Sequence, residues 1–324
     1  MDTILSESAR RSPRVALVVP CFNEALALRH TAERLIAVLG NLRGTGRISR
    51  ESFIYFVDDG SLDESWSILC QLHQNDPQIK ALKLVRNFGQ QNALLAGLTA
   101  VKNRADCAIT LDADLQHDEA AIVEFLDGFR DGADIVNGVR RNSANDSITK
   151  KLGSASFYWL MRLMGTGITK DQPDYRLISA PVLDALAQYP EVNLFLRGIF
   201  AKIGFKSGTV YYDERKRIAG NSRYSAIKLI GLALDGITSF TVLPLRMIAL
   251  GGTLITLISL AIGVFIVISA FRGNVVPGWA STVLPIYLLG GFQIMLTGLV
   301  AEYIGKIYSE VKRRPRFLSE KELN

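Results

Sequence analysis

The chain has 324 residues and a formal net charge of +6, with 37 lysines and arginines against 31 aspartates and glutamates. A basic balance is typical of nucleic-acid-binding proteins, but no motif that interleaves basic with aromatic residues accompanies it, so we expect no nucleic acid partner. The three cysteines show neither CxxC spacing nor a cysteine–histidine ligand pattern, which argues against a zinc site and favours a reducing compartment.

Short runs rich in β-branched residues alternate with segments of helical periodicity behind Met1–Pro13, which we expect to be a mobile tail. Strands joined by helices of this length form right-handed crossovers and a mostly parallel sheet that helices cover on both faces. The predicted fold class is therefore α/β. The predicted strands are Val15–Val19, Phe53–Val57, Ala81–Val85, Cys107–Leu111 and Asp134–Val139, and the predicted helices are Ala25–Leu39, Asp63–His73, Gln90–Val101 and Glu119–Arg130.

Between these elements, Asn41–Arg50 is expected to be a surface loop, and Asn142–Ser147 is a polar loop of the kind that forms lids. Apolar residues then recur at helical spacing near residues 148–165, with basic residues off that line. This pattern is typical of a helix that lies in a membrane interface, and a helix packed on the sheet is the alternative. A similar interfacial helix is predicted over residues 224–240.

Two long uncharged stretches, Met247–Phe271 and Gly273–Ala301, follow the predicted sheet. At 1.5 Å of rise per residue, about 25 helical residues reach roughly 37 Å, which exceeds the roughly 30 Å of a bilayer's hydrocarbon core. The stretches predict a hairpin of two transmembrane helices over residues 243–304.

Positive residues follow the second stretch, in a segment over residues 305–324 that we expect to be a basic tail facing anionic lipid. Arg272 alone marks the loop between the stretches, so the positive-inside rule places both termini and the soluble domain, residues 14–223, in the cytoplasm. The first apolar run is too short for the core of a signal peptide. We predict a multi-pass protein of the inner (plasma) membrane, whose sheet core is complete without the spans.

Carboxylates gather where two predicted strands end, the edge at which ligands bind in such sheets. Asp112 and Asp114 project to one side of an extended chain, and Gln116 adds an oxygen two residues further on. Hard oxygen ligands at this spacing suit Mg²⁺ or Mn²⁺ and leave coordination positions open for substrate phosphates. A pair of aspartates that caps a helix or sits in a turn is the alternative.

A second acidic run, Asp58–Ser61 (DDGS), ends the second predicted strand. It is either a strand-ending turn with Ser61 as a helix N-cap or a carboxylate site that accepts hydrogen bonds from a nucleobase or ribose. The first strand ends in Pro20–Glu24 (PCFNE), which places polar groups at the same edge. Neither segment decides between the two interpretations by itself.

Taken in order, Pro20–Glu24, Asp58–Ser61, Arg86–Gly89 (RNFG) and Asp112–His117 (DADLQH) resemble the motifs of glycosyltransferase family 2. The resemblance is to its polyprenyl-phosphate branch, which includes dolichol-phosphate mannose synthase and the bactoprenol glucosyltransferases. It covers nearly the whole chain, the paired C-terminal stretches included. It implies the GT-A sheet fold, a divalent cation (Mg²⁺ or Mn²⁺) and a nucleotide sugar donor, UDP-glucose first.

The resemblance also implies roles for single residues. His117 is left out of the site, because relatives accept Asn or Asp there. Asp174 stands where relatives carry an aspartate proposed as a base, although Pro173 replaces the glycine of their Gly-Asp-Phe-Arg-type motif. The implied donor nucleoside residues are Pro20, Asn23, Glu24, Asp58 and Asp59; the cation ligands are Asp112, Asp114 and Gln116; the catalytic residues are Asp174, Arg176 and Arg217; and the acceptor phosphate residues are Arg140, Arg217 and Arg223.

The acceptor implied by the resemblance is a phosphate monoester, whose second pKa of about 6 leaves it mostly ionised near pH 7 without a base. Asp174 then has a second interpretation, in which it orients Arg176 or the sugar. Arginines suit an acceptor phosphate because guanidinium groups fork onto phosphate oxygens and keep their charge. Basic residues that attract anionic lipid at a membrane surface are the alternative for each arginine.

The resemblance therefore predicts an inverting transferase that moves one hexose, glucose first, from a nucleotide diphosphate sugar to polyprenyl (undecaprenyl) phosphate at the cytoplasmic membrane face. Mannose, galactose and aminosugars are the alternatives. A processive polysaccharide synthase is a rival, but it has more spans and usually a Gln-x-x-Arg-Trp segment, and this chain contains no Arg-Trp pair. A non-enzymatic, nucleotide-binding membrane regulator is the other rival. Homo-oligomerisation stays open.

Overall fold

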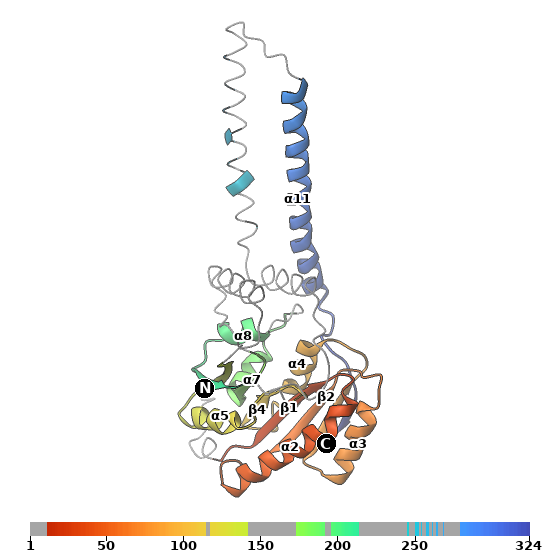
Figure 1. The fold of residues 1–324 in the computed structure, drawn as a ribbon, viewed down its shortest axis with the longest axis vertical. Coiled ribbons are helices and arrows are strands. Elements are labelled where there is room, and N and C mark those ends of the chain that lie inside the picture. Colours follow the sequence, from red (N-terminus) through yellow and green to blue (C-terminus); the bar gives the residue numbers. More distant parts are fainter. Residues whose placement is uncertain are drawn as a thin grey trace. The chain divides into compact units, whose positions relative to one another are not determined.

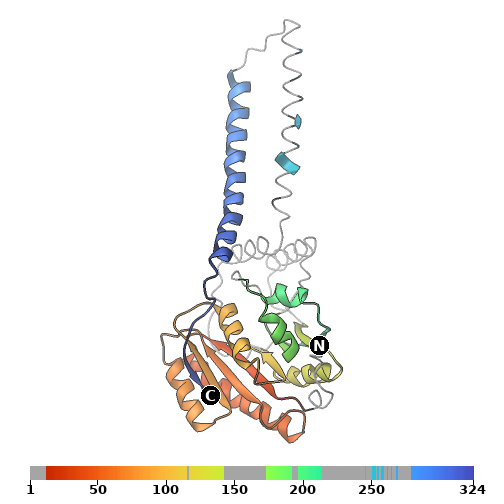
Figure 2. The ribbon, with the colours of Figure 1, turned by 180° about the vertical axis from the view of Figure 1, so that it is seen from behind.

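The computed structural model describes residues 12–114, 117–141, 173–191, 196–213 and 279–324, together with single positions between 245 and 268. The chain divides into two compact units. The first unit joins Met1–Ser225 to Arg314–Asn324, and the second is Ala226–Arg313. The two units are drawn in Figure 1 and, from the opposite side, in Figure 2.

The first unit is built on an eight-stranded sheet with the order β7-β5-β6-β4-β1-β2-β3-β8. Its centre is parallel, because β1 pairs in parallel with β2 and β4, and β2 pairs in parallel with β3. The antiparallel pairs are β4 with β6, β5 with β6 and β3 with β8. The strands are β1 (Val15–Cys21), β2 (Phe53–Asp58), β3 (Ile79–Leu84), β4 (Cys107–Thr110), β5 (Ile135–Arg140), β6 (Arg176–Ser179), β7 (Ser207–Tyr212) and β8 (Ser319–Leu323).

Helices cover both faces of this sheet, and each face has its own hydrophobic cluster. Along β1, Leu17 and Val19 belong to one cluster, whereas Ala16 and Val18 belong to the other, because successive side chains of a strand point to opposite faces. The first cluster is completed by α2 (Ala25–Gly44), α3 (Ser65–Asn75) and α5 (Ala121–Arg130), and the second by α4 (Gln90–Val101), α7 (Ala180–Leu186) and α8 (Leu196–Lys202).

The five predicted strands and four predicted helices are present, and Gln90–Val101 has the predicted bounds. The strand ends differ by one or two residues. The loop predicted over Asn41–Arg50 is wrong at its start, since α2 continues to Gly44. The strands β6, β7 and β8 and the short helices α7 and α8 were not predicted.

The C-terminal strand β8 belongs to the sheet of the first unit, where it pairs with β3. Phe317 and Leu323 pack against the two opposite hydrophobic clusters, and Tyr55 donates a hydrogen bond to Glu322 at 2.8 Å. The prediction that residues 305–324 form only a basic, lipid-facing tail is therefore wrong for the last residues. The prediction that the sheet core is complete without the spans concerned residues 243–304 and did not foresee β8, which follows them in the chain, so a truncation before the spans would also remove a strand of the sheet.

Deleting residues 319–324 is expected to lower the free energy of unfolding of the first unit by about 2–4 kcal/mol. The deletion removes the backbone hydrogen bonds between β8 and β3, each worth about 0.5–1.5 kcal/mol net. Thermal unfolding of the full chain measures the effect. The control is Lys321→Ala, which keeps the ladder and removes only an exposed side chain. Equal stability of the deletion and the control would contradict the role given to β8.

The second unit contains α11 (Trp279–Lys312), a 34-residue helix with Pro285 inside it. No helix in the part of the chain that the structure describes is both long and apolar enough to cross a membrane. The predicted two-span hairpin over residues 243–304 is therefore not supported by the described residues. Most of Met247–Phe271, the lid loop Asn142–Ser147 and the interfacial helices predicted near 148–165 and over 224–240 lie outside them.

The helix α4 lies close to the sheet at Gly97, where an added Cβ would come within 2.5 Å of Val18 Cγ1 and 2.7 Å of Val57 Cγ2. We expect Gly97→Ala to destabilise the chain by about 1–3 kcal/mol, because the packed strands cannot move aside without strain. Gly40→Ala on α2 is the matched control, since nothing lies within 4 Å of the added carbon. It should be neutral or stabilise by up to about 1 kcal/mol. Equal midpoints of thermal unfolding for both variants would refute this account of α4.

Candidate active site

An open cavity of about 280 Å³ lies at the carboxyl ends of β1, β2 and β4. Parallel strands bring their carboxyl ends to one edge, so residues distant in sequence meet there. The segment after β3 and the first residues of α4 form the rest of the cavity wall. The cavity is lined by Pro20, Cys21, Phe22, Glu24, Asp59, Asn87, Gly89, Gln90, Ala93, Asp112, Ala113 and Asp114.

Of the predicted donor residues, Pro20, Glu24 and Asp59 line this cavity. Asp59 is 3% exposed, and its carboxylate accepts backbone N–H bonds from Phe88 at 2.7 Å and Gly89 at 2.9 Å. Burial raises the pKa of Asp59, and these two N–H bonds oppose that effect. Asp59 thus connects the end of β2 to the loop that precedes α4. Gly89 in this loop has a φ of +91°, a conformation that glycine adopts readily because it has no side chain.

Two further predicted donor residues, Asn23 and Asp58, are not among the described residues that line the cavity. Asp58 is fully buried; one carboxylate oxygen accepts the N–H of Ser61 at 3.1 Å, and burial raises its pKa. Asn23 adopts a φ of 54° and joins two loops, since its side chain accepts the N–H of Leu62 at 2.8 Å and its own N–H donates to Ser61 Oγ at 2.9 Å. Both residues therefore stabilise the loops next to the cavity through hydrogen bonds to Ser61 and Leu62.

Close approach of two loops explains the glycine of the DDGS run. Gly60 has a φ of +65°, and a Cβ there would lie 2.4 Å from the backbone carbon of Arg86. Only a residue without a side chain fits that contact in that conformation. The strand-ending turn is therefore present, but Ser61 is not its helix N-cap, because α3 begins at Ser65 with Glu64 at the cap position. The nucleoside-binding interpretation stays a prediction.

Asp112 and Asp114, the predicted cation ligands, follow β4 and both line the cavity. Gln116 lies outside the described residues, and no group of three His, Cys, Asp or Glu side chains suited to a metal occurs among the residues that are described. Two carboxylates with hard oxygens, facing an open polar cavity, fit a Mg²⁺ or Mn²⁺ ion that takes its other ligands from substrate phosphates and water.

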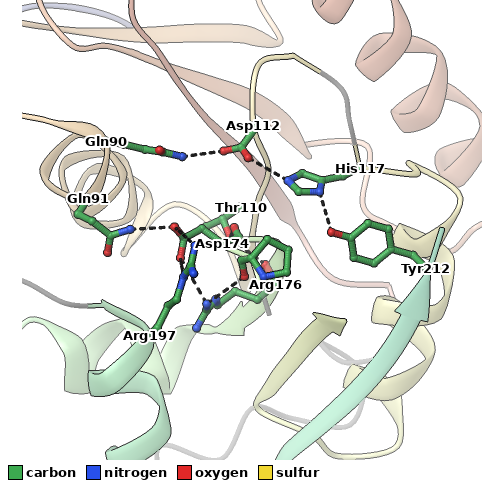
Figure 3. Close-up of polar contacts among 10 residues, drawn as sticks. Gln90, Gln91, Thr110, Asp112, His117, Asp174, Arg176, Arg197 and Tyr212 are labelled. Atoms are coloured by element: carbon green, nitrogen blue, oxygen red, sulfur yellow. Dashed lines mark hydrogen bonds and ion pairs between the residues drawn. The ribbon is translucent and has the colours of Figure 1, made fainter. Parts of the chain in front are cut away.

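The Asp112 carboxylate is held on both sides (Figure 3). Gln90 Nε2 donates to its Oδ1 at 2.8 Å, and His117 Nε2 lies 3.1 Å from its Oδ2. The other ring nitrogen of His117 lies 2.9 Å from the hydroxyl of Tyr212. His117 was left out of the predicted site, yet it is buried directly behind the cavity wall.

Asp174 lies in a separate cluster of charged and polar groups (Figure 3). Its carboxylate accepts hydrogen bonds from Gln91 Nε2 at 2.8 Å and from Arg197 Nε and Nη2 at 3.2 and 3.3 Å. Its backbone carbonyl accepts the hydroxyl of Thr110 at 2.6 Å. Burial by itself favours the neutral acid, but the charges of Arg197 and Arg176 and these hydrogen bonds outweigh it and hold the pKa of Asp174 below its ordinary value.

Arg176 is enclosed behind Asp174 and is not among the described residues that line the cavity. It is 2% exposed, donates to the carbonyl of Pro173 at 3.2 Å, and stacks over the ring of Phe200 at 4.7 Å. Burial lowers its pKa to about 10, against the opposing charge of Asp174. The prediction that Arg176 is catalytic is not supported by this placement. Its position indicates that it supports Asp174.

The predicted acceptor residues are only partly described. Arg140 ends β5, half-buried and outside the set of described residues that line the cavity. Arg217 and Arg223 lie outside the described residues.

Sequence reasoning missed Gln90, which lines the cavity, and Gln91 and Arg197, which bind the carboxylate of Asp174. The two glutamines directly follow the RNFG motif at the start of α4, which was a usable signal. Arg197 is a single charge in the apolar run 194–200, and a lone arginine in such a run indicates a buried partner. Asp174, 23 residues earlier in the chain, supplies that partner.

A family model described as "Glycosyl transferase family 2" matches residues 16–183, slightly more than half of the chain. The chain belongs to this family. It is therefore a glycosyltransferase, and the predicted α/β, GT-A type fold with a mostly parallel sheet is confirmed.

Two similar proteins illustrate the relationship. The uncharacterized glycosyltransferase YkoT of Bacillus subtilis is 42% identical over 94% of this chain and 90% of its own length. The SfII prophage-derived bactoprenol glucosyl transferase of Shigella flexneri is 36% identical over 95% of this chain and 98% of its own length. The resemblance to the polyprenyl-phosphate branch is thereby confirmed.

Among solved structures, mannosyl-3-phosphoglycerate synthase from Rubrobacter xylanophilus has the same fold. The TM-score is 0.50 at 14% identity, over 74% of this chain and 75% of that chain. At this identity the match concerns the fold alone.

Proposed function

We propose that this glycosyltransferase transfers a single hexose, glucose first, from a nucleotide diphosphate sugar to polyprenyl (undecaprenyl) phosphate. We infer that the reaction takes place at the cytoplasmic face of the inner membrane, where a lipid acceptor and a soluble nucleotide sugar can meet. The proposal is supported by several relatives named bactoprenol glucosyl transferase, which are 35–36% identical and match this chain over 98–99% of their own length.

The observation that carries the proposal is the pair of carboxylates, Asp112 and Asp114, in the wall of one open cavity with Asp59 and Glu24. Such a cavity is acidic, so it would repel a bare diphosphate. Asp112 and Asp114 would hold a divalent cation, which would supply positive charge to neutralise the charge that develops on the departing diphosphate. We infer that the nucleoside of the donor lies along Pro20, Glu24 and Asp59.

The acceptor phosphate needs no base for the reaction. Its second pKa is about 6, so an oxygen is already ionised near pH 7. That oxygen forms a bond to the anomeric carbon while the bond from this carbon to the donor diphosphate breaks, and the configuration inverts. We infer that Arg140, Arg217 and Arg223 bind the acceptor phosphate, and that Asp174 acts by holding Arg197.

A donor screen tests the proposal. The purified full chain in detergent is incubated with undecaprenyl phosphate, Mn²⁺ and a panel of nucleotide sugars, and the lipid is analysed by mass spectrometry. One hexose added per lipid, with UDP-glucose giving the fastest transfer, is the expected result. Addition of many sugars to one lipid would favour a processive synthase. Nucleotide binding without transfer to any lipid would favour a non-enzymatic regulator.

A further inference from the structure

The side chain of Asp112 lies in a continuous hydrogen-bonded row (Figure 3). The row runs from Gln90 through Asp112 and His117 to Tyr212, with the distances 2.8, 3.1 and 2.9 Å between neighbours. It joins the start of α4 to the last residue of β7. Asp112 is the member that faces the cavity, with a side chain that is 33% exposed.

The chemistry of the groups fixes the direction of the hydrogen bonds. A carboxylate has no proton to donate, so the Nε2 of His117 must carry the proton that it shares with Asp112. In a neutral imidazole the other nitrogen is then an acceptor, and the hydroxyl of Tyr212 donates to it. Asp112 therefore sets the tautomer of His117, and the hydroxyl of Tyr212, which can donate, satisfies the remaining ring nitrogen and holds the ring in place.

Aromatic packing fixes the position of the His117 ring. It is 2% exposed and stacks on Tyr175 at a centroid distance of 4.7 Å and an interplanar angle of 11°. Tyr212 stands edge-on to His117 at 5.6 Å and to Tyr175 at 5.2 Å. Tyr175 in turn donates its hydroxyl to the carbonyl of Asp118 at 3.0 Å. The ring is thus confined before any ligand binds.

We propose that His117 and Tyr212 are positioning residues, which hold the Asp112 carboxylate in the orientation that binds the cation and, through it, the donor diphosphate. The proposal rests on the proposed function for the identity of the ligand. Carboxylates that bind metals are commonly oriented by hydrogen bonds from a second layer of residues. His117 does not line the cavity within the described part of the chain, so it acts through Asp112 and not on the substrate.

The first test is Tyr212→Phe in the full chain. This variant keeps the ring that packs on Tyr175 and removes only the hydroxyl. We expect the Mn²⁺ concentration for half-maximal nucleotide binding to rise about 10-fold, the lower end of the roughly 10–100-fold loss seen when such second-layer partners are removed. Binding is measured by calorimetry. The nucleotide is UDP or GDP, according to which of the two the unaltered chain binds more tightly. Tyr211→Phe is the matched control, because this neighbour on β7 is 54% exposed and should leave the Mn²⁺ dependence unchanged.

Substitutions of His117 distinguish positioning from packing. His117→Gln can still donate from its amide nitrogen to Asp112 and accept from Tyr212, so it should keep most of the Mn²⁺ affinity, whereas His117→Leu should lose it. Equal loss in both variants, or an unchanged Mn²⁺ dependence in Tyr212→Phe, would overturn the proposal. If the unaltered chain transfers no sugar to polyprenyl phosphate but Tyr212→Phe still weakens Mn²⁺-dependent nucleotide binding, the positioning role stands and the proposed acceptor is wrong.

Discussion

Asp114→Ala is expected to reduce sugar transfer by a factor on the order of 10² to 10³. The residue lines the cavity beside Asp112, and its loss removes one of the two carboxylates that can hold a divalent cation there. Without the cation, the charge that builds on the leaving diphosphate is not neutralised, and this stabilisation is worth several kcal/mol. Initial rates with undecaprenyl phosphate and the best donor of the panel measure the effect.

The matched control is Asp131→Ala, which removes an exposed carboxylate at the end of α5. It should leave the rate unchanged, because surface substitutions of this kind rarely alter stability by more than about 0.5 kcal/mol. Chelation of divalent cations should reduce the unaltered chain to the level of Asp114→Ala. Full activity in the presence of chelator would contradict the assignment of Asp112 and Asp114 as cation ligands.

The central strands could be predicted from sequence because each is a short, nearly continuous apolar run, as expected where helices cover both faces of a parallel sheet. The sequence SEKEL of β8 has no such pattern. It is an edge strand that joins the sheet through its backbone, and its partner β3 is more than two hundred residues away in the chain. Likewise β6 has only four residues and starts with a buried arginine, so it lacks the continuous apolar run by which the central strands were predicted.

The location of the site was predictable for a related reason. Strand-ending carboxylates meet because parallel strands end at one edge, so Asp59, Asp112 and Asp114 were expected together. The role of each carboxylate was not predictable, because a sequence does not show which carboxylate oxygens already accept hydrogen bonds within the protein. Asp58 turns out to be buried, and Asp59 accepts two backbone N–H bonds from a loop that the sequence places almost thirty residues later.

The pKa of Asp174 gives an expectation for the pH dependence of stability. Because its folded pKa is depressed, its contribution to stability is complete above the unfolded value of about 3.9 and is lost as the pH falls through the folded value. Between pH 5 and 9 the carboxylate therefore stays ionised. A carboxylate with a lowered pKa is also a weak base, since an efficient general base titrates near the operating pH.

Asp174→Asn is therefore expected to lower transfer by roughly 10- to 100-fold through misplacement of Arg197, the size of loss that a small displacement of a site group causes. Its rate should still rise with pH through about 6 and then level, because the ionisation of the acceptor phosphate controls it. Loss of the buried charge beside Arg176 is also expected to destabilise the fold by about 3–5 kcal/mol, so rates are compared well below the unfolding temperature.

A double-mutant cycle with Arg197→Gln separates positioning from proton transfer. If Asp174 acts by holding Arg197, each single variant loses a similar amount of activity and the double variant loses little more, because the two side chains work as one unit. If Asp174 is an obligatory base, Asp174→Asn is nearly inactive at every pH while donor binding stays normal. Its transfer rate is then lower than that of Arg197→Gln by a factor of order 10² to 10⁴. We expect the first result, because the attacking phosphate oxygen already carries its negative charge, whereas the Asp174 oxygens are engaged by Gln91 and Arg197.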